Sequence, residues 1–353
     1  MITVFIPHLQ DKNRYLDEII VYSKSTFIYG NYKEYKKHYS IVNIQFPEAI
    51  FDWKLPTQKQ LLELEDYFVQ WKKHSKIVYT MNDLKKHSNN APMFDKLFQL
   101  VHKYADGVIH LGTFSLNEYS SLFSDKCQHK VIYHPIYASL AMDDFKTLDV
   151  QRIIPFDLNE KYIVSAIGSI RSKKEMRLIL KIFKNIAVQD KVLIVPRMNQ
   201  FAPIPKFVPY RFRKLYRNIA DKINFYSIRT EDYFIGNVFL EYDYLVDLVK
   251  KSNLLIIPRV DNLNSGNLFL GLTFDKEMVV PSIGNLTEIL TLFKIPFFDF
   301  KKFNKETLNE FILSIKNKPY NQVIDYEQNK KILHQSAIAA EYDIFFKSLI
   351  END

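Results

Sequence analysis

The sequence predicts an α/β protein built from two doubly wound domains, each with a parallel sheet covered by helices on both faces. Short apolar strands alternate with amphipathic helices along nearly all of the 353 residues. An irregular stretch at residues 138–159 interrupts this alternation, and a second alternation follows it. The apolar fraction of 47% and the charged fraction of 25% are ordinary for a globular protein with material for two cores.

The first half of the chain supplies the first domain. Strands are expected at residues 1–7, 40–47, 76–80, 106–112 and 130–135, and helices at 17–24, 57–74, 94–105 and 115–123. The helix at 57–74 has strong helical periodicity and begins after Pro56 with Thr57, a good N-cap residue. Right-handed strand–helix–strand connections assemble such elements into one parallel sheet. We therefore expect residues 1–150 to form one domain.

The second half repeats the pattern. Strands are expected at residues 161–168, 191–196, 222–227, 254–258 and 277–281, and helices at 175–187 and 242–252. Further helices are expected after Gly266, from about Leu286, and at 327–350. We expect residues 151–330 to form the second domain and residues 331–353 to lie in a final helix.

The cysteine content and the lengths of the apolar segments argue against a disulfide-bonded, a membrane-spanning or a secreted protein. The single cysteine, Cys127, excludes an intramolecular disulfide and is expected to be a small buried residue rather than a nucleophile. No segment is long and apolar enough to span a bilayer, and the charged DKNR after the first strand does not fit a signal peptide. The expected location is cytoplasmic, with peripheral association with the inner membrane face as an extension.

The net charge of +8 favours anionic partners. Basic and aromatic residues interleave in two clusters, one from Asn31 to Tyr39 (NYKEYKKHY) and one from Lys206 to Arg217 (KFVPYRFRKLYR). The first interpretation of each is a solvated helix face, and the second is a patch that contacts an anionic membrane. Specific nucleic-acid binding is third, because no recognition module accompanies the clusters.

The most informative segment is residues 254–290, which contains two successive strand–loop–helix units. The first loop contains Ser265, Gly266 and Asn267, and the second contains Gly284. Glycine is scarce, at 8 residues, so glycines in such loops have a conformational reason. Two helix N-termini at one edge of a parallel sheet suit a phosphate or diphosphate. The segment therefore predicts a nucleotide-type ligand.

Basic residues follow other strands of the same predicted sheet. Gly168 ends a buried strand, and Arg171 and Lys174 follow it, where paired cations would neutralise a diphosphate. A surface pair near a helix terminus is the alternative, and the location at the ligand-binding edge favours the site. Arg197 and Arg259 each follow a strand that ends in proline, so one of them is expected to line the pocket and the other to bridge to an acidic residue.

The order of these motifs resembles GT-B glycosyltransferases, and more narrowly the bacterial enzymes related to glycosyltransferase family 4 that build capsule and other surface polysaccharides. The resemblance covers nearly the whole chain. In the first half it rests on YTMNDLKKH, DGVIHLGTFS and VIYHP, and in the second on GSIRSKKE, VPR, NSG and GNLTE.

The resemblance implies an acceptor-binding first domain, a nucleotide-sugar-binding second domain, and a C-terminal helix that packs back on the first domain. It implies a metal-independent transfer from a UDP- or GDP-type sugar without a further cofactor, and no His, Cys and carboxylate set has metal-ligand spacing. The implied donor-binding residues are Gly168, Arg171, Lys174, Arg197, Ser265, Gly266, Asn267 and Glu288. Glu288 has an equal alternative as an ordinary first-turn helix acid.

The residues that act on the acceptor are expected in the loops of the first domain. An inverting transfer needs a general base opposite the departing nucleotide, and Asp83 is the first candidate and His8 the second. The alternatives are a helix N-cap for Asp83 and a hydrogen-bonded loop histidine for His8. Asn82, His110 and His134 are expected to line the acceptor cleft.

The chain departs from the family pattern at three positions. Leu263 and Gly271 stand where retaining members carry two glutamates, and Asn82 stands where histidine is usual. The expected function is transfer of a sugar to a glycan acceptor, lipid-linked as the resemblance implies, for surface polysaccharide synthesis. The departures keep a non-catalytic nucleotide- or sugar-binding homologue open. A pyruvyl-type transferase, which can use a GT-B-like architecture, is a further alternative among enzymes.

Overall fold

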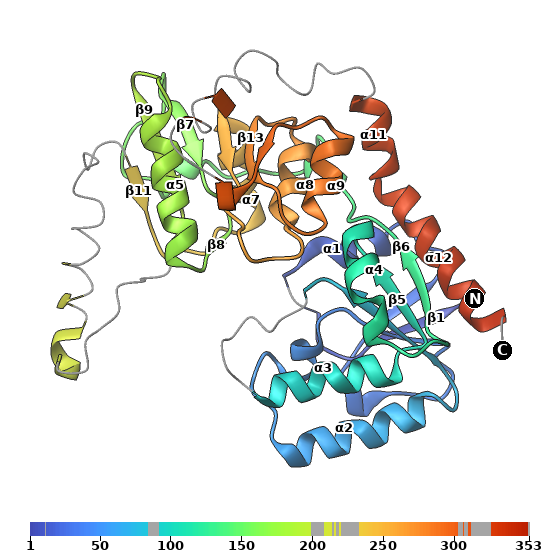
Figure 1. Ribbon diagram of the computed structural model, residues 1–353. Helices are drawn as coiled ribbons and strands as arrows, with labels where there is room; N and C mark the ends of the chain where they lie inside the picture. Colours follow the sequence, from blue (N-terminus) through green and yellow to red (C-terminus); the bar gives the residue numbers. More distant parts are fainter. Residues whose placement is uncertain are drawn as a thin grey trace.

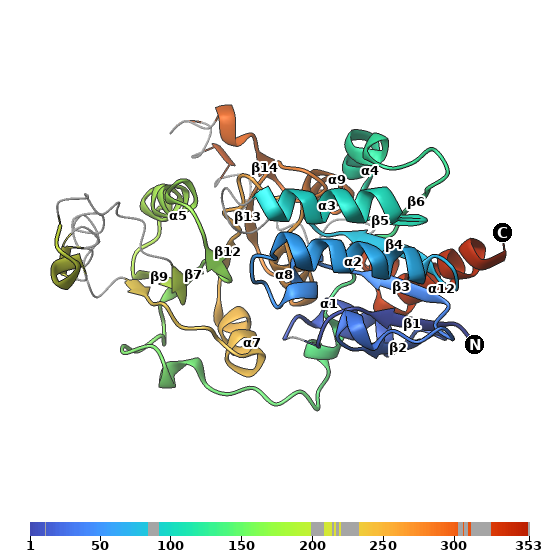
Figure 2. The ribbon, with the colours of Figure 1, turned by 90° about the horizontal axis from the view of Figure 1, so that it is seen from below.

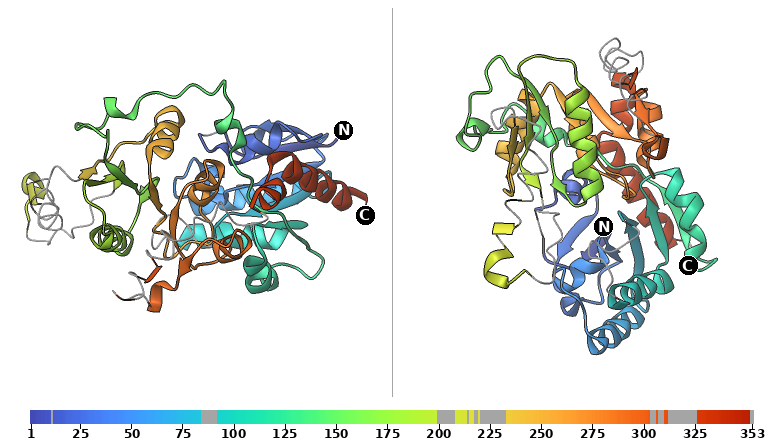
Figure 3. Two further views of the ribbon diagram at one scale, coloured as in Figure 1. Left: turned by 90° about the horizontal axis from the view of Figure 1, so that it is seen from above. Right: turned by 60° about the vertical axis from the view of Figure 1, so that its left-hand side comes forward.

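The computed structural model describes residues 1–10, 12–83, 92–198, 208–213, 215, 216, 219, 233–302, 306, 310, 311 and 326–351. Figure 1 shows two α/β domains, with the last two helices running from the second domain along the first. The two termini lie near each other on the N-terminal domain (Figure 3). Within the described ranges no helix combines the length and apolarity needed to cross a membrane.

The N-terminal domain contains a six-stranded parallel sheet in the order β2-β1-β3-β4-β5-β6. Its strands are β1 (Thr3–Ile6), β2 (Thr26–Tyr29), β3 (Ile41–Ile44), β4 (Lys76–Met81), β5 (Gly107–His110) and β6 (Gln128–Val131). Its helices are α1 (Arg14–Ile20), α2 (Gln58–Trp71), α3 (Pro92–Tyr104) and α4 (Thr113–Tyr119). Thr57 caps α2 as expected, in a reciprocal capping box with Gln60.

Helices cover both faces of this sheet (Figure 2). Apolar residues of α2 and α3 pack on one face, around the fully buried Phe68 and Trp71. Residues of α1 pack on the other face together with α12 (Gln335–Glu351), the C-terminal helix. Tyr15 and Tyr342 join their hydroxyls at 2.7 Å in that second core. The chain therefore returns to its first domain, as the family resemblance implied.

The C-terminal domain contains a second six-stranded parallel sheet in the order β11-β9-β7-β12-β13-β14. Its strands are β7 (Tyr162–Ser165), β9 (Lys191–Val195), β11 (Tyr233–Ile235), β12 (Leu254–Ile256), β13 (Met278–Pro281) and β14 (Phe297–Phe298). Helix α5 (Lys173–Asn185) covers one face, and α7 (Tyr242–Lys251), α8 (Gly266–Thr273) and α9 (Leu286–Leu292) cover the other. A short parallel pair, β8 (Ser169–Ile170) and β10 (Arg197–Met198), joins the loops that follow β7 and β9.

Short 3-10 helices occupy the connections. Among the described residues they are η1 (Tyr32–Glu34), η2 (Pro47–Phe51), η3 (Ser120–Leu122), η4 (Ala138–Ala141), η5 (Val150–Arg152), η6 (Tyr210–Phe212) and η8 (Phe300–Lys302). The interdomain connection between β6 and β7, which is described throughout, contains only η4 and η5, as its irregular sequence suggested. The proposed domain boundaries at residues 150/151 and 330/331 lie near η5 and near the end of α11 (Tyr326–Ile332).

The structure corrects several details of the sequence analysis. Strand β2 was not among the expected strands, because the segment TFIY at the sheet edge is short and only partly buried, so its pattern does not indicate a core strand. The short edge strands β11 and β14 of the second sheet were missed as well. The β6 strand ends at Val131, before the segment YHP. The strand expected at 222–227 lies outside the described residues.

The helix expected at 327–350 is in fact two helices, α11 and α12. Leu333 and His334 separate them. The His334 ring accepts a hydrogen bond from the backbone N–H of Ser336 at 3.3 Å, and its Nδ1 lies 2.8 Å from the Ser336 hydroxyl. The side chain of His334 thus caps the start of α12, a role that the apolar periodicity of the segment does not reveal.

Candidate functional site

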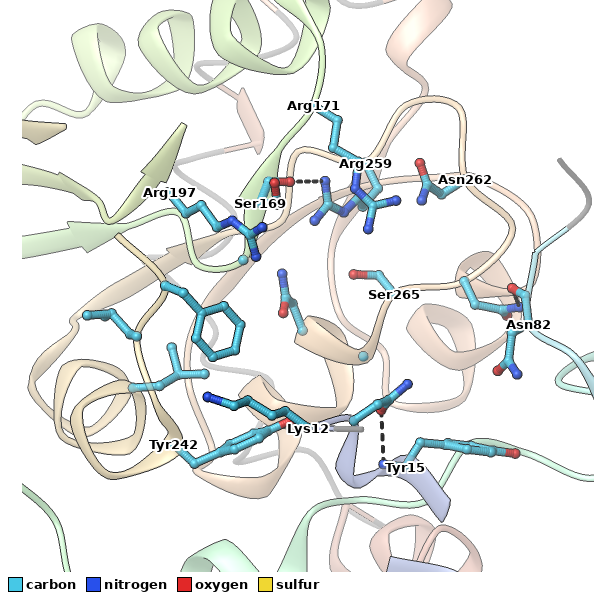
Figure 4. Close-up of a pocket in the computed structure, with 18 of the residues that line it drawn as sticks. Lys12, Tyr15, Asn82, Ser169, Arg171, Arg197, Tyr242, Arg259, Asn262 and Ser265 are labelled. Atoms are coloured by element: carbon cyan, nitrogen blue, oxygen red, sulfur yellow. Dashed lines mark hydrogen bonds between the residues drawn. The ribbon is translucent and has the colours of Figure 1, made fainter. Parts of the chain in front are cut away.

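A cavity of about 750 Å³ lies where the carboxyl edges of the two sheets meet. Figure 4 shows Arg171, Arg197 and Arg259 extending into it from the C-terminal domain, with Lys12 and Tyr15 on the opposite side. The strand orders explain this location. Each sheet has a point where connections leave neighbouring strands in opposite directions, β1 and β3 in the first sheet and β7 and β12 in the second. Such points are where open α/β sheets form crevices for ligands.

A buried ion pair shapes the C-terminal wall. Arg259, after β12, lies 2.8 Å from the carboxylate of Glu175 in α5, and both side chains are almost fully buried. The same guanidinium donates to the carbonyl oxygen of Ser169 at 2.9 Å. The other carboxylate oxygen of Glu175 accepts from the backbone N–H of Arg171 at 2.6 Å. Arg259 and Glu175 together fix the loop that follows β7, which is the bridging role expected for one of the two arginines.

Two further guanidiniums line the cavity beside the buried pair of Arg259 and Glu175. Pairing of β8 with β10 places Arg197 opposite Ser169, and Arg171 follows two residues later in the same loop. Desolvation in the cleft lowers the pKa of the Arg171 guanidinium, and repulsion from Arg259 and Arg197 lowers it further, against attraction by Asp83 and Glu175. Concentrated positive charge of this kind is stabilised by an anionic ligand.

The N-terminus of α8 faces the same cavity. Ser265, Gly266 and Asn267 all line it, and the Ser265 side chain makes no capping hydrogen bond. Gly168 has a φ of +81°, and a Cβ there would lie 2.5 Å from Asn267 Nδ2. The Asn267 amide donates to the Ile167 carbonyl at 2.8 Å. Glycine at position 168 thus lets the β7 loop approach α8, as its place at a strand end suggested.

The N-terminal wall contains the candidate base. Asp83 follows β4 and lines the cavity. Desolvation, opposed by the attraction of Arg171 and Arg259 and assisted by repulsion from Glu48, raises the pKa of its carboxyl from 3.8 to about 7. A carboxyl that titrates near neutral pH can accept a proton from a substrate hydroxyl.

The neighbouring Asn82 lies in a buried polar network. Its amide donates to the backbone carbonyl of Gln45 at 2.9 Å, which joins the ends of β3 and β4. Asn264 of the C-terminal domain donates to the Asn82 carbonyl at 2.7 Å, and the Asn285 amide donates to Asn264 at 2.9 Å. Asn82 therefore positions the Asp83 loop against the second domain as well as lining the cavity.

His134 lines the floor of the cavity. Its ring stacks on Phe269 with centroids 4.2 Å apart, and its Nδ1 lies 2.6 Å from the carbonyl oxygen of Pro135. Burial lowers the pKa of His134 to about 4, so the imidazole is neutral near pH 7. The remaining nitrogen lies 3.5 Å from the hydroxyl of Tyr137, which approaches Gly266 closely. His134 therefore offers packing and neutral hydrogen bonding at the site.

Lys12 crosses the cavity from the N-terminal domain. It forms an ion pair with Glu241 of the C-terminal domain, and its ammonium lies 5.5 Å from the centroid of Phe239. The Arg197 guanidinium lies at the same distance from that ring. Phe239 is thus an exposed aromatic ring close to one cation from each domain.

Four predicted site residues lie outside the lining of this cavity. Lys174 is exposed and lies 3.9 Å from Asp261. His8 is buried beside Tyr29, with Nδ1 2.8 Å from the Leu9 carbonyl oxygen. His110 is fully buried, where it contacts Ser115 at 3.2 Å and His129 at 2.9 Å. Desolvation lowers the pKa of His110 to about 4.

Glu288, the fourth, joins the two domains. Its carboxylate accepts hydrogen bonds from the backbone N–H and hydroxyl of Thr113, at 2.7 and 2.8 Å, and from the hydroxyl of Tyr133 at 2.5 Å. Both partners belong to the N-terminal domain. In this arrangement the Glu288 carboxylate forms hydrogen bonds across the domain interface and does not face the cavity.

Two of the departures from the family pattern have structural reasons. Leu263 is buried among aromatic residues of the N-terminal core, so its side chain holds the domains together. Gly271 lies inside α8, where an added Cβ would be 2.2 Å from the sulfur of Met278. A glutamate at residue 271 does not fit this packing.

Several lining residues were not identified from the sequence. Lys12, Asn13, Phe46 and Trp53 follow β1 and β3, whose ends meet at the crevice of the first sheet. Their types carry no motif, and only the strand order brings them to the site. Inspection of the loops that follow these two strands would have found them, once the strand order was known.

The two basic-aromatic clusters differ. In the first cluster Tyr32 and Tyr39 are buried in the N-terminal core, where Tyr39 stacks on Phe5 with centroids 5.0 Å apart. These rings are therefore not available to a membrane. In the described part of the second cluster Tyr210 is 86% exposed and Phe212 is also exposed.

No family model matches the chain, and no curated protein is significantly similar to it. Solved structures share its fold. HepE of Anabaena in complex with UDP has a TM-score of 0.58 at 12% identity, over 100% of this chain and 98% of that chain. A glycosyltransferase from Rickettsia africae ESF-5 has a TM-score of 0.61 at 12% identity, over 100% and 99%.

A sucrose-phosphate synthase from Thermosynechococcus elongatus has a TM-score of 0.58 at 13% identity, over 89% of this chain and 75% of that chain. These neighbours are GT-B glycosyltransferases. The fold of this chain, with two parallel six-stranded sheets facing a common cavity, is therefore the GT-B fold that the sequence predicted.

Proposed function

We propose that this protein is a glycosyltransferase that moves a sugar from a nucleoside-diphosphate sugar to a glycan acceptor. One observation carries the proposal. Three guanidiniums, those of Arg171, Arg197 and Arg259, meet the N-terminus of α8 on one wall of an interdomain cavity. This combination suits a diphosphate, because fixed cations and backbone N–H groups stabilise its charge both in the bound donor and in the leaving group.

In the proposed donor site, Arg171 and Arg197 contact the diphosphate, and Arg259 adds charge while it holds the β7 loop. Ser265, Gly266 and Asn267 offer backbone N–H groups, and Gly168 allows the β7 loop to lie close to them. Phe239 is a stacking surface for the nucleobase. Lys174 and Glu288 belong to the proposed donor set through the family resemblance alone.

UDP is the first nucleotide to test. HepE of Anabaena is solved with UDP and with UDP-glucose, and a trehalose-phosphate synthase from Burkholderia xenovorans with a TM-score of 0.60 is named as UDP-forming. The shared fold makes a UDP-sugar donor the natural hypothesis for this chain, ahead of GDP.

We assign Asp83 as the general base and propose an inverting transfer. Asp83 takes the proton of the acceptor hydroxyl while that oxygen attacks the anomeric carbon, and the bond to the nucleoside diphosphate breaks. Its raised pKa suits the task, and it comes from the domain opposite the arginines. Asn82 and His134 line the acceptor side. His8 is a weaker candidate for the base because it does not line the cavity, and His110, which was expected on the acceptor side, does not line it either.

The proposed acceptor is a lipid-linked glycan used in surface polysaccharide synthesis. The resemblance to capsule enzymes supports this role. The exposed rings of Tyr210 and Phe212, whose centroids lie 5.7 and 4.9 Å from arginine guanidiniums, support contact with an anionic membrane. Co-sedimentation with anionic vesicles, compared with a Tyr210→Ser/Phe212→Ser variant, tests the membrane contact separately.

A thermal-shift series with UDP, GDP and CDP tests the donor site, and hydrolysis or transfer from the matching sugar nucleotides tests catalysis. We expect stabilisation by UDP and release of UDP from its sugar. If none of the nucleotides raises the melting temperature, the donor site as proposed is wrong. Binding without any turnover across a broad acceptor panel would instead support a non-catalytic homologue, which the missing glutamates at Leu263 and Gly271 motivate.

A further inference from the structure

We propose that Phe46 and Trp53 form an aromatic subsite that binds a pyranose ring of the acceptor beside Asp83. The inference rests on the proposed function and identifies the class of group that the acceptor presents to the cavity. Both residues line the cavity, and their ring centroids lie 5.5 Å apart with the planes tilted by 45°. Neither residue belongs to a motif of the sequence.

The backbone places these rings next to the candidate base. Phe46 follows Gln45 directly, and Asp83 follows Asn82 directly. The Asn82 amide donates to the Gln45 carbonyl at 2.9 Å, so the two chain segments leave the sheet side by side. A ligand on the aromatic rings therefore lies within the reach of the loop that carries Asp83.

Trp53 is held in an unusual backbone conformation. Asp52 and Trp53 have φ values of 52° and 62°, in the left-handed region that large side chains rarely adopt. Their N–H groups donate to the carbonyl oxygens of Ala49 and Glu48, each at 3.0 Å, at the end of η2. Such strain persists where the surrounding structure imposes it, and it is frequent at ligand sites.

The exposure of Trp53 also indicates a ligand site. Trp53 lines the cavity and is 44% exposed, whereas Trp71, the other tryptophan of the chain, is fully buried in the core. An indole that remains in contact with solvent at the lip of a cavity gains stability when an apolar surface covers it.

A pyranose ring matches this environment. One face of the ring carries C–H groups that pack on an aromatic surface, and its rim carries hydroxyl groups. The carboxyl group of Asp83 lies on the neighbouring loop for that rim, and Asn82 and Asn264, whose amides hydrogen-bond within the protein, line the cavity beside it. A nucleobase would also stack on an indole, but the diphosphate-binding arginines and Phe239 belong to the other domain. We therefore assign Trp53 to the acceptor.

The two tryptophans make the test direct. Acrylamide, a neutral quencher that the arginines do not attract, is expected to quench Trp53 and to spare the buried Trp71. We expect at least one of the methyl glycosides of glucose, galactose, mannose and N-acetylglucosamine, added with saturating UDP, to shield the wild-type protein from quenching. UDP or uridine alone should give little shielding. A Trp53→Phe variant, which retains only Trp71, provides the unquenched reference.

Variants test the contact without relying on fluorescence. By saturation-transfer NMR, Trp53→Ala and Phe46→Ala should weaken glycoside binding by roughly tenfold, the order expected for loss of an aromatic contact. Trp53→Phe should retain binding within a few-fold, and Trp53→Leu should not. Phe114→Ala, which removes an exposed ring outside the cavity, is the matched control. The UDP-induced thermal shift should be unchanged in all of these variants.

Three results would overturn the inference. They are shielding of Trp53 by uridine or UDP but by no glycoside, no shielding by any ligand, or equal glycoside binding in Trp53→Ala and wild-type protein. In each case an intact UDP thermal shift leaves the proposed donor site standing. Absence of that shift in the wild-type protein would mark the failure of the proposed function instead.

Discussion

The cavity wall from the C-terminal domain is cationic, whereas the wall from the N-terminal domain consists mainly of aromatic rings, amides and one carboxyl group. On the first wall Arg171, Arg197 and Arg259 stand together. On the second wall the cation Lys12 is paired with Glu241 across the cavity. Most of the positive charge of the cavity therefore comes from one domain, while the proposed proton acceptor comes from the other.

The walls also differ in how burial affects their charges. Glu175 compensates Arg259 in a buried pair and fixes the surrounding loop through the backbone. For Asp83 desolvation outweighs the attraction of the arginines, so its pKa is raised. A rigid cationic wall suits a substrate group that is always charged, and a carboxyl that titrates near pH 7 suits a step in which a proton moves. The contrast supports the proposal that one wall binds the donor and the other serves the acceptor.

Removing the charge of Asp83 should have the largest effect on catalysis. We expect Asp83→Asn to lower the rate of transfer roughly 100- to 10,000-fold, the usual contribution of a general base, with the affinity for UDP nearly unchanged. The wild-type rate constant kcat/KM should fall as the pH drops below about 7, because the carboxylate is then protonated.

Stability provides an independent check on Asp83. Its folded-state pKa is raised from 3.8 to about 7, so the fold favours the protonated carboxyl, and stability is lost as the pH rises through this window. Above pH 7 Asp83→Asn should therefore melt at a higher temperature than wild type, with a smaller difference near pH 4. A lower melting temperature at high pH would contradict the assigned burial.

Breaking the buried ion pair between Arg259 and Glu175 in the cationic wall should have the largest effect on stability. Glu175→Ala leaves Arg259 as an uncompensated buried charge and should lower the free energy of unfolding by about 3–5 kcal/mol, measured by urea denaturation. Glu63→Ala, which breaks the exposed pair between Lys33 and Glu63, is the control and should leave the transition nearly unchanged. Similar stabilities of the two variants would show that the pair does not hold the wall.

The cationic wall was largely predictable from the sequence, and the opposite wall was not. Arginines and glycines that follow apolar strands identify one sheet edge, so Gly168, Arg171 and Arg197 could be placed without a structure. Phe46 and Trp53 have no such signature, because the crevice of the first sheet depends on the strand order. The edge strand β2 was missed, and without it nothing in the sequence locates the point where β1 and β3 separate.

Details of packing were also beyond the sequence. The pairing of Arg259 with Glu175 joins residues 84 positions apart, and Glu288 bonds to residues 155 and 175 positions away. A helix-start glutamate looks the same in the sequence whether it faces a ligand or a neighbouring domain. Only the contact between the domains distinguishes these roles.

Removing a single charge from the cationic wall should weaken donor binding. Arg171→Ala is expected to raise the dissociation constant of UDP about 10- to 100-fold, which corresponds to a lost charge-assisted hydrogen bond. Arg177→Ala, on the exposed surface of α5 outside the cavity, is the control. Isothermal titration of both variants measures the difference.

Replacement of Lys174 tests whether a cation outside the cavity also contributes to donor binding. The family pattern includes it in the donor site, while here it is exposed and lies beside Asp261. We expect Lys174→Ala to weaken UDP binding less than Arg171→Ala does. Equal losses would show that the domains rearrange around the donor and bring Lys174 into the cavity.

The smallest effect on donor binding should come from the interdomain contact between Glu288 and Tyr133. Tyr133 donates to Glu288, and burial together with that carboxylate raises the pKa of the tyrosine hydroxyl, so it stays protonated. If Glu288 serves the interface, Glu288→Gln and Tyr133→Phe should both lower stability by about 1–2 kcal/mol and change the affinity for UDP-glucose by less than about threefold. If Glu288 instead contacts the donor, Glu288→Gln alone should lose affinity for UDP-glucose. The two variants thus decide whether this carboxylate belongs to the cationic wall or to the contact that holds both walls in place.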